Sequence, residues 1–261
     1  MCSSALLAAN GTPWVAFIEH DGKADVLKLA RKNAGGIEII GAVSAPGIVH
    51  QPALAFDGKG ALWTVAGMVG ADDVVHLHAR RFADGKFDVA IPLAKSAGAD
   101  TFADARTDHA GRVWVVWQSM RRGQGDIFAK WFDPASAKWS DEIRVNKPEG
   151  GNWEPRVAFD GRDGAWVVFD SSRGGEFNLF LAHVGLDGAV PPSDDFLRRY
   201  ALLHAAHAAA TEHVRPGVSC ESVDAAARAV IEAGGEGARF FHRTGHGIGL
   251  EEHEDPYIVA G

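Results

Sequence analysis

ALAFDGKGALWTVAG, at residues 53–67, returns with small changes as ARTDHAGRVWVVWQS at 105–119 and as VAFDGRDGAWVVFDS at 157–171. In each stretch an Asp stands six residues before a Trp. When Trp14 is included, successive Trp residues of the series are 49, 51 and 52 residues apart. A period near 50 residues is the signal of a repeat architecture of the propeller kind.

Each repeat has the pattern of a meander of short antiparallel strands. In RVWVVWQSMRRGQGDIFAKWFD, residues 112–133, two alternating runs flank a polar loop that contains glycines. Asp-Gly turns are expected to reverse the chain between strands, because Asp tolerates the turn conformation and Gly accepts a positive φ. Each Trp then offers a large apolar face to the neighbouring blade.

These repeats resemble the β-propeller repeats of TolB-like and sialidase-like proteins over roughly residues 4–190. The resemblance implies a mostly β chain that begins with an incomplete β-propeller of about four blades. The spacing between Asp and Trp differs by one residue from that of the sialidase Asp-box. The resemblance is therefore to architecture, and it implies no sialidase activity.

The repeated Asp and Trp residues are predicted to be turn and packing residues, since they recur from one repeat to the next. A ligand would be held by polar residues that do not recur. The stretch EGGNWEPR, residues 149–156, is the most distinctive of this kind, and an inter-blade loop is the alternative interpretation of it. Its candidate binding residues are Trp153, Glu154 and Arg156.

The composition changes near DGAVPPSDD, residues 187–195. All eight Trp residues lie before this stretch, and no Lys follows Lys147. The glycine and prolines of the stretch supply the chemistry of a turn or linker. We therefore predict two domains, a propeller at 1–190 and an α+β segment at 191–261.

Two helices and a strand are predicted after this boundary. The first helix follows a capping Ser193 and stops at the Pro-Gly pair 216–217. The second runs from a cap at Ser219 to the Gly pair 234–235, and ARFFHRT, residues 238–244, is typical of a strand. The predicted apolar faces hold Phe196, Tyr200, Leu203, Ala210 and Val214 on the first helix, and Val223, Ala227, Val230 and Ile231 on the second.

From Val214 onward the sequence carries a more specific resemblance. VRPGVSCESVDAAARAVI, residues 214–231, followed by FHRTGHGIGLEEHEDP, residues 241–256, is similar to the second half of the pita-bread metallopeptidases. That family includes methionine aminopeptidase, Xaa-Pro aminopeptidase and prolidase, and the similarity is strongest to the Xaa-Pro branch. It implies an α+β fragment of a pita-bread fold and the ancestry of a metal-dependent Xaa-Pro peptidase.

The resemblance assigns roles to three histidines. His246 falls on a metal-ligand histidine, His253 on an active-site histidine that contacts the scissile peptide, and His242 on a histidine of the same pocket. The implied cofactor is a divalent metal, Mn, Co or Zn, and the implied substrate is a peptide. In such an enzyme two divalent ions activate a bridging water and polarise the peptide carbonyl. The glycines beside His246 allow close approach of the substrate, and residues 242 and 246 project to one side if the strand is extended.

Four of the five metal ligands that the resemblance implies, two Asp and two Glu, have no counterpart in the sequence. A single imidazole cannot hold a catalytic dication, because stable zinc sites use three or four protein ligands. We expect the chain alone to be inactive, with a peptide as substrate only where the metal site is completed. His204 and His207 are predicted to lie on a helix surface. Upstream, Asp160 and Asp170 are ten residues apart but do not match the implied Asp pair, and Asp160 belongs to the repeat. The carboxylates near the histidines, Glu251, Glu252 and Glu254, do not fall on ligand positions.

Three interpretations of the whole chain remain open. The first is a composite of an incomplete propeller and an incomplete peptidase segment, with apolar helix faces left exposed after Ser193. The second is a non-enzymatic binding or scaffold module, whose propeller takes a protein or small-molecule ligand and whose tail helps to close it. In the third, another chain donates the missing metal ligands.

Charge and hydropathy argue against two classes of partner. A net charge of -8 without a run of Lys or Arg is not the pattern of a nucleic-acid binder. No segment has the length of a membrane span, and the start MCSSALLAANGTPW lacks the basic and apolar regions of a signal peptide. We expect a cytoplasmic chain without nucleic-acid or membrane partners.

Overall fold

The computed structural model describes residues 3–94, 96–147, 149–161, 163–175, 177–190, 194–247 and 253–259. The chain divides into two compact units, Met1–Pro191 and Pro192–Gly261. Among the residues described, no helix is both long and apolar enough to cross a membrane.

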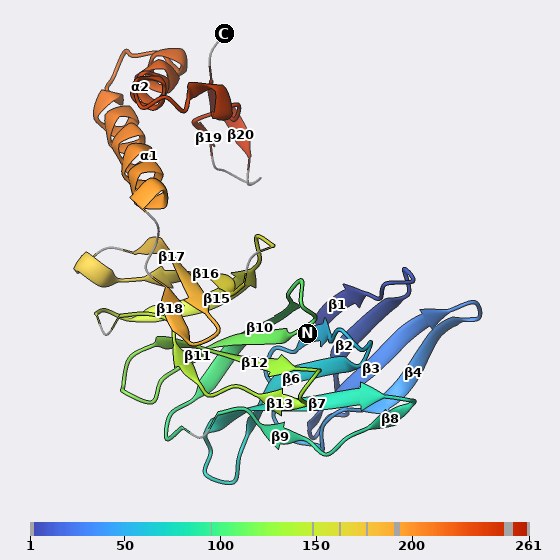
Figure 1. Cartoon of the computed structure of the whole chain (residues 1–261). Helices are drawn as coiled ribbons and strands as arrows, with labels where there is room; N and C mark the ends of the chain where they lie inside the picture. The colour runs from blue at the N-terminus through green and yellow to red at the C-terminus, as the bar shows by residue number, and fades with distance from the viewer. Residues whose placement is uncertain are drawn as a thin grey trace. The chain divides into compact units, whose positions relative to one another are not determined.

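The first unit consists of four antiparallel sheets, each built from consecutive strands and called here blades 1 to 4 (Figure 1). Blade 1 contains β1 Ser3–Leu7, β2 Pro13–His20, β3 Asp25–Asn33 and β4 Gly36–Ala42. Blade 2 contains β5 Ala53–Phe56, β6 Leu62–Val69, β7 Val75–Ala83, β8 Lys86–Phe87 and β9 Ile91–Pro92. Blade 3 contains β10 Asp100–Thr107, β11 Val113–Ser119, β12 Asp126–Asp133, β13 Lys138–Trp139 and β14 Ile143–Arg144. Blade 4 contains β15 Asn152–Ala158, β16 Ala165–Ser171, β17 Asn178–Gly185 and β18 Gly188–Val190, with a 3-10 turn, η1 Arg173–Gly175, before β17.

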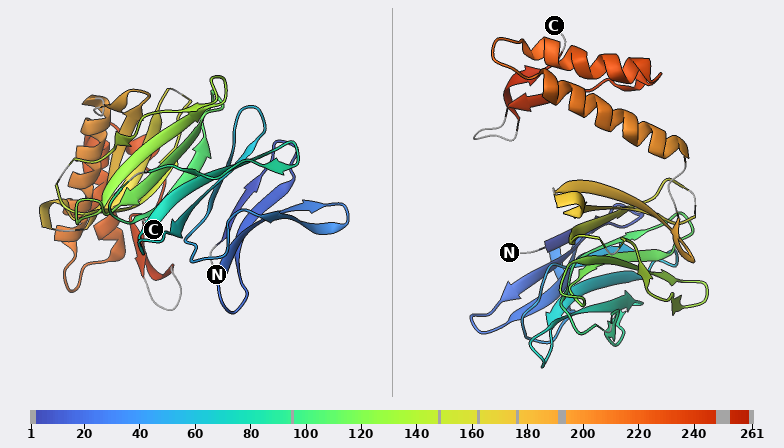
Figure 2. Two further views of the ribbon diagram at one scale, coloured as in Figure 1. Left: turned by 90° about the horizontal axis from the view of Figure 1, so that it is seen from below. Right: turned by 90° about the vertical axis from the view of Figure 1, so that its left-hand side faces the viewer.

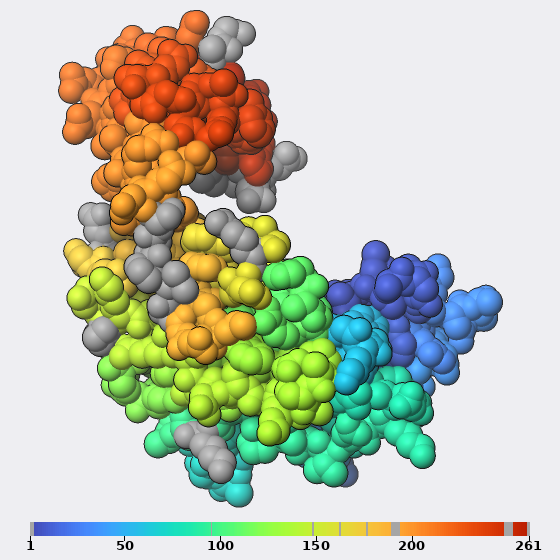
Figure 3. Space-filling view, in the orientation of Figure 1, coloured from blue at the N-terminus to red at the C-terminus, as the bar shows by residue number. Residues whose placement is uncertain are grey.

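The blades follow one another in space in the order of the chain. Two views place blade 1 at one end of this unit and blade 4 at the other (Figures 1 and 2), and the surface view shows the same succession of blades from blue to yellow (Figure 3). The predicted mostly β architecture with about four propeller blades is therefore confirmed.

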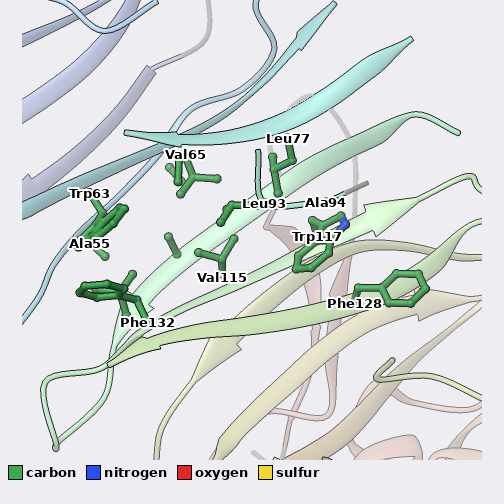
Figure 4. Packing of buried hydrophobic residues seen from close by; sticks show 14 residues of the cluster. Ala55, Trp63, Val65, Leu77, Leu93, Ala94, Val115, Trp117, Phe128 and Phe132 are labelled. Carbon is green, nitrogen blue, oxygen red and sulfur yellow. The ribbon is translucent and has the colours of Figure 1, made fainter. Parts of the chain in front are cut away.

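Three hydrophobic cores hold the blades together, one between each consecutive pair. Figure 4 shows the core between blades 2 and 3, in which Trp63 and Val65 of β6 lie near Val115 and Trp117 of β11. All seven residues of β11 are buried, because both faces of this inner sheet are covered. In β16 of the last blade, buried and half-buried residues alternate instead. This alternation is typical of a strand with one face covered.

The repeated Asp residues organise the turn before each Trp strand. Asp108 accepts hydrogen bonds from the backbone amides of Ala110 and Arg112 at 3.0 and 2.9 Å, and from the Trp114 indole Nε1 at 3.0 Å. The same indole bond joins Trp63 to Asp57 at 3.2 Å and Trp166 to Asp160 at 3.1 Å. The repeated Asp and Trp are therefore turn and packing residues, as predicted.

Of the three turns before a Trp strand, the last has a positive φ directly after the Asp, at Gly161 (φ 84°), as predicted for an Asp-Gly turn. In the first two of these turns the left-handed conformation falls on Gly60 (φ 83°) and Gly111 (φ 80°), three residues after the Asp. The Gly directly after Asp57 does not have it. In those two turns the Asp side chain caps the turn, and the positive φ falls where the chain enters the next strand.

The second unit contains two helices and a short hairpin. Its elements are α1 Asp194–His213, α2 Cys220–Ala233, the 3-10 turn η2 Gly237–Arg239, β19 Gly245–Gly247 and β20 Glu254–Ile258. Ser219 caps α2, since its side chain accepts a hydrogen bond from the amide of Ser222 at 3.1 Å. The predicted cap of α1, Ser193, lies outside the described residues. The core of the unit consists of Ala206, Ala210, Val223, Ala227 and Ile231, with Val230 partly buried against it.

In this unit one expectation is met and one prediction is wrong. The helix α1 packs on α2 through Ala206 and Ala210, and the apolar residues Tyr200, Leu203 and Val214 are exposed, as expected for the composite interpretation. Small side chains allow the two helices to approach closely, so the larger ones lie to the side. Residues 238–244 form no strand, because the Arg228 guanidinium donates hydrogen bonds to the carbonyl oxygens of Phe240 and His242, at 2.8 and 2.9 Å.

Candidate functional site

The hairpin of β19 and β20 brings two of the three predicted site histidines together. His246 lies at the centre of β19, opposite Tyr257 of β20, and His253 lies directly before β20. The ring centroids of His246 and His253 are 4.2 Å apart, with 37° between the ring planes. The hairpin thus brings together two histidines that are seven residues apart in the sequence.

The hydrogen bond of His246 fixes which ring nitrogen carries the proton. Its Nδ1 lies 2.9 Å from the carbonyl oxygen of Gly247. Because a carbonyl oxygen can only accept, Nδ1 must donate, and the neutral ring then has its lone pair on Nε2. In this tautomer Nε2 is the nitrogen that can accept a hydrogen bond or bind a metal.

His242 is exposed and lies before β19, in the segment that forms no strand. Its Nδ1 lies 3.0 Å from the carbonyl oxygen of Arg243. The condition under which residues 242 and 246 would project to one side, an extended strand, is therefore not met.

A buried carboxylate that the sequence reasoning missed supports this hairpin. Asp224 of α2 is fully buried and accepts a hydrogen bond from the Thr244 hydroxyl at 2.6 Å, directly before β19. Its other oxygen accepts from Arg228 Nε. Arg228 in turn donates to the carbonyl oxygens of Phe240 and His242 and lies over the Phe240 ring. Asp224 and Arg228 thereby tie α2 to the segment that carries the histidines.

The environment of Asp224 keeps it ionised. Burial alone would raise the pKa of Asp224, but hydrogen bonds from Arg228 and Thr244 and the charge of Arg228 lower the pKa below its ordinary value. The available signal in the sequence was an Asp next to Val223 on the buried face of a helix, with an Arg four residues later. A carboxylate at such a position requires a partner.

The described residues do not form a set that would hold a metal ion. Within the described part of the chain, no group of three or more His, Cys, Asp or Glu side chains converges. Asp224 is occupied by Arg228 and Thr244, and Glu251 and Glu252 lie outside the described residues. His204 and His207 are exposed on α1.

The candidate binding residues of the propeller lie at a bulge at the start of β15. The pairing of β15 with β16 shifts register between Trp153 and Arg156, and Glu154 has a positive φ of 48°. The Trp153 ring lies 5.2 Å from the ring of Phe177. In blade 3 the equivalent strand β10 has the same irregularity, with Phe102 at a φ of 52°. Asp160 accepts a hydrogen bond from the Trp166 indole. Asp170 of β16 lies opposite Trp153 of β15.

A cavity of about 300 Å³ opens between the first strands of blades 1, 2 and 3. Its lining includes Ser4 of β1, Leu54 of β5, and Asp104 and Arg106 of β10. Asp104 also accepts a hydrogen bond from the amide of Val157 at 3.0 Å, and this links β10 to β15.

Comparison with known proteins finds different similarities for the two parts of the chain. Residues 173–261 match metallopeptidase family M24. A probable dipeptidase PepE of Mycobacterium tuberculosis is 56% identical over 70 residues, which are 27% of this chain and 19% of that protein. A Xaa-Pro dipeptidase of Lactobacillus helveticus is 44% identical over 70 residues, again 27% of this chain and 19% of that protein. The chain thus spans about a fifth of the length of these curated relatives.

For the first unit, similarity is found among solved structures. The Hadza microbial sialidase Hz136 matches 70% of this chain and 43% of its own, with a TM-score of 0.50 and 13% sequence identity. At that identity the likeness concerns the fold alone. The chain therefore joins a β-propeller fold to a C-terminal segment related to metallopeptidase family M24, a family that implies a divalent metal ion.

Proposed function

We propose that the C-terminal unit carries part of the active site of a metal-dependent Xaa-Pro dipeptidase, and that this chain does not hydrolyse peptides by itself. The identity to the two dipeptidases supports the first statement. The second statement rests on what surrounds His246. The Nδ1 hydrogen bond of this imidazole leaves Nε2 as the nitrogen that can bind a metal. Among the described residues, however, there is no group of three side chains that could hold a metal ion.

In this proposal each histidine has a separate task. His246 would hold a divalent ion such as Mn²⁺, Co²⁺ or Zn²⁺ through Nε2, and His253 and His242 would face the peptide substrate. The position of His253 against the His246 ring supports this assignment, while the exposed His242 needs a further element to face the same space.

The experiment is a calorimetric titration of the whole chain with Mn²⁺ or Co²⁺, with a Xaa-Pro dipeptide assay on the same samples. The variants are His246→Ala and, as matched control, His207→Ala on the exposed surface of α1. We expect no micromolar binding and no hydrolysis in any of them. Micromolar binding that His246→Ala alone abolishes, with hydrolysis, would show that ligands from another chain complete the site.

A second measurement tests the ligand role of His246 directly. Mn²⁺ at millimolar concentration should broaden the imidazole NMR signals of His246 and His253 before those of His204 and His207. Equal broadening of all four would contradict the assignment of His246 as a ligand.

A second candidate function is ligand binding by the propeller, favoured by the strained backbone at Phe102 and Glu154. Positive φ values at residues other than glycine cost about 1 kcal/mol each and gather at functional sites. Both lie at bulges of first strands, and the cavity of about 300 Å³ borders one of these strands. A fragment library screened by Trp fluorescence tests this. Hits should be lost in Arg106→Ala and retained in Lys86→Ala, and a screen without such hits would contradict the candidate.

A further inference from the structure

The inter-blade packing of the first unit has a direction. We call the face of a blade that is turned to the next blade in sequence its forward face, and the opposite one its backward face. Trp14 of blade 1 contacts Phe56 and Phe82 of blade 2, and Trp63 of blade 2 contacts Phe132 of blade 3. The repeated Trp therefore marks the forward face, and each inter-blade core joins one forward face to one backward face.

Two positions of the third strand follow this rule through the repeats. They stand opposite the residues two and four after the repeated Trp. In blades 1 to 3 the side chains there are at most 1% exposed. These residues are Leu27 and Leu29, then Leu77 and Ala79, then Ile127 and Ala129.

In blade 4 the same two positions are uncovered. Leu179 is 65% exposed and Leu181 is 37% exposed. Large aliphatic side chains have been kept at positions that a following blade would bury. The forward face of blade 4 thus has the chemistry of an interface.

Blade 1 shows the complementary irregularity on its backward face. Ala5 of β1 is exposed, whereas its equivalents Leu54, Ala105 and Val157 in the three later blades are buried. Ile37 of β4 is 76% exposed. Its equivalents in blades 2 and 3, Phe87 and Trp139, pack against inter-blade cores.

We propose that the forward face of blade 4 binds the backward face of blade 1 of a second copy of this chain. The occupant follows from the packing rule, because every forward face covered by another blade in this unit is covered by a backward face of the same construction. Among the described residues of the first unit, no other blade covers the forward face of blade 4 or the backward face of blade 1. The contact continues the three interfaces already present within the chain, in a head-to-tail manner.

Two variants and one control test this proposal in the whole chain by sedimentation velocity. Leu179→Arg blocks the forward face, and Ile37→Arg blocks the backward face. Val89→Arg is the matched control, since Val89 is 86% exposed in blade 2 but belongs to neither terminal face. All three positions are exposed, and circular dichroism should report unchanged folding.

We expect the unmodified chain and Val89→Arg to associate with rising concentration, and each of the other two variants to stay monomeric. A 1:1 mixture of Leu179→Arg and Ile37→Arg should form a dimer, because each retains the face that the other has lost. A mixture that stays monomeric would overturn the proposal. So would association blocked by only one of the two variants, which indicates a symmetric contact.

Two other occupants of these faces give distinct results. If the C-terminal unit covers the forward face of blade 4, the unmodified chain stays monomeric and Leu179→Arg lowers its stability. If neither face is covered, the chain stays monomeric and no variant changes its stability. Both results would overturn the proposal.

Discussion

The two units of this chain differ in the contacts that hold them folded. The first unit has three cores formed by repeated positions, and its inner strand β11 is buried along its whole length. The second has one core of five buried hydrophobic residues and a buried Asp224 that joins α2 to the histidine hairpin. The most specific motif of the sequence therefore lies on the less densely packed unit. Recognition of a family and strength of folding are separate properties of a sequence.

The two units can be observed separately in one sample. All eight Trp residues lie between Trp14 and Trp166, so Trp fluorescence reports the first unit. The two α-helices described, α1 and α2, lie in the second, so circular dichroism at the helical band reports that unit. Each prediction below uses this pair of signals.

The largest effect is expected for Trp114→Ala in the core between blades 3 and 4. Trp114 is fully buried, and its removal should lower the free energy of unfolding of the first unit by about 3–5 kcal/mol. Urea unfolding followed by Trp fluorescence measures this, while the helical signal should unfold as before. Trp153→Ala, at a half-buried indole, is the control and should cost under about 1 kcal/mol. Equal effects of the two variants would contradict the core assignment.

Asp224→Ala should affect only the second unit. Arg228 and Thr244 lose their shared acceptor, and removal of one partner of a buried ion pair costs about 3 kcal/mol. The helical signal should therefore be lost at a lower urea concentration, with the Trp signal unchanged. Glu221→Ala, an exposed carboxylate on the same helix, is the control. An unchanged helical transition in Asp224→Ala would show that α2 and the hairpin are not coupled through this residue.

Asp108→Ala and Asp160→Ala sharpen the comparison within the first unit, because the same turn is buried in blade 3 and exposed in blade 4. Asp108→Ala leaves two amides, the Trp114 indole and the Arg112 guanidinium without their acceptor and should cost about 2 kcal/mol. Asp160→Ala should cost less than about 1 kcal/mol, since water reaches the groups it leaves. Urea unfolding by Trp fluorescence tests the order, and a reversed order would exclude burial as its cause.

The smallest effect is a pH dependence of the second unit. The pKa of Asp224 in the folded state lies below its ordinary value of 3.8. Its contribution to stability is therefore complete above that value and is lost as the pH falls through the folded-state pKa. Thermal unfolding of the unmodified chain and Asp224→Asn from neutral pH to pH ~3, followed at the helical band, should show their difference shrink on acidification. A constant difference would contradict the ionised state of Asp224.

The propeller could be predicted because its information is periodic. The Asp and Trp of each repeat, with alternating runs around them, determine turn, strand and facing side in one local pattern. In the second unit the face of α2 was predicted correctly, because Val223, Ala227 and Ile231 follow a helical period. On α1 the expected exposed apolar face is present, but the contact of Ala206 with α2 was not predicted, because the choice between Ala206 and the larger Leu203 depends on how closely the two helices approach.

For the candidate site, the sequence predicted residues but not their surroundings. The family resemblance singled out His246 and His253, and the structure places their rings side by side. The bonds that position them depend on Asp224 and Thr244, which are twenty residues apart in sequence. No local pattern encodes a contact between a helix side chain and the start of a later strand.

The equivalence of the three inter-blade cores has a consequence for how the length of this chain can change. Loss or duplication of about one whole repeat joins a forward face to a backward face of the same kind, so the remaining blades keep their packing. Loss of a single residue from a strand instead moves each following side chain of that strand to the wrong face. A lineage of such proteins is therefore expected to vary in steps of whole blades, with insertions of other lengths confined to the turns.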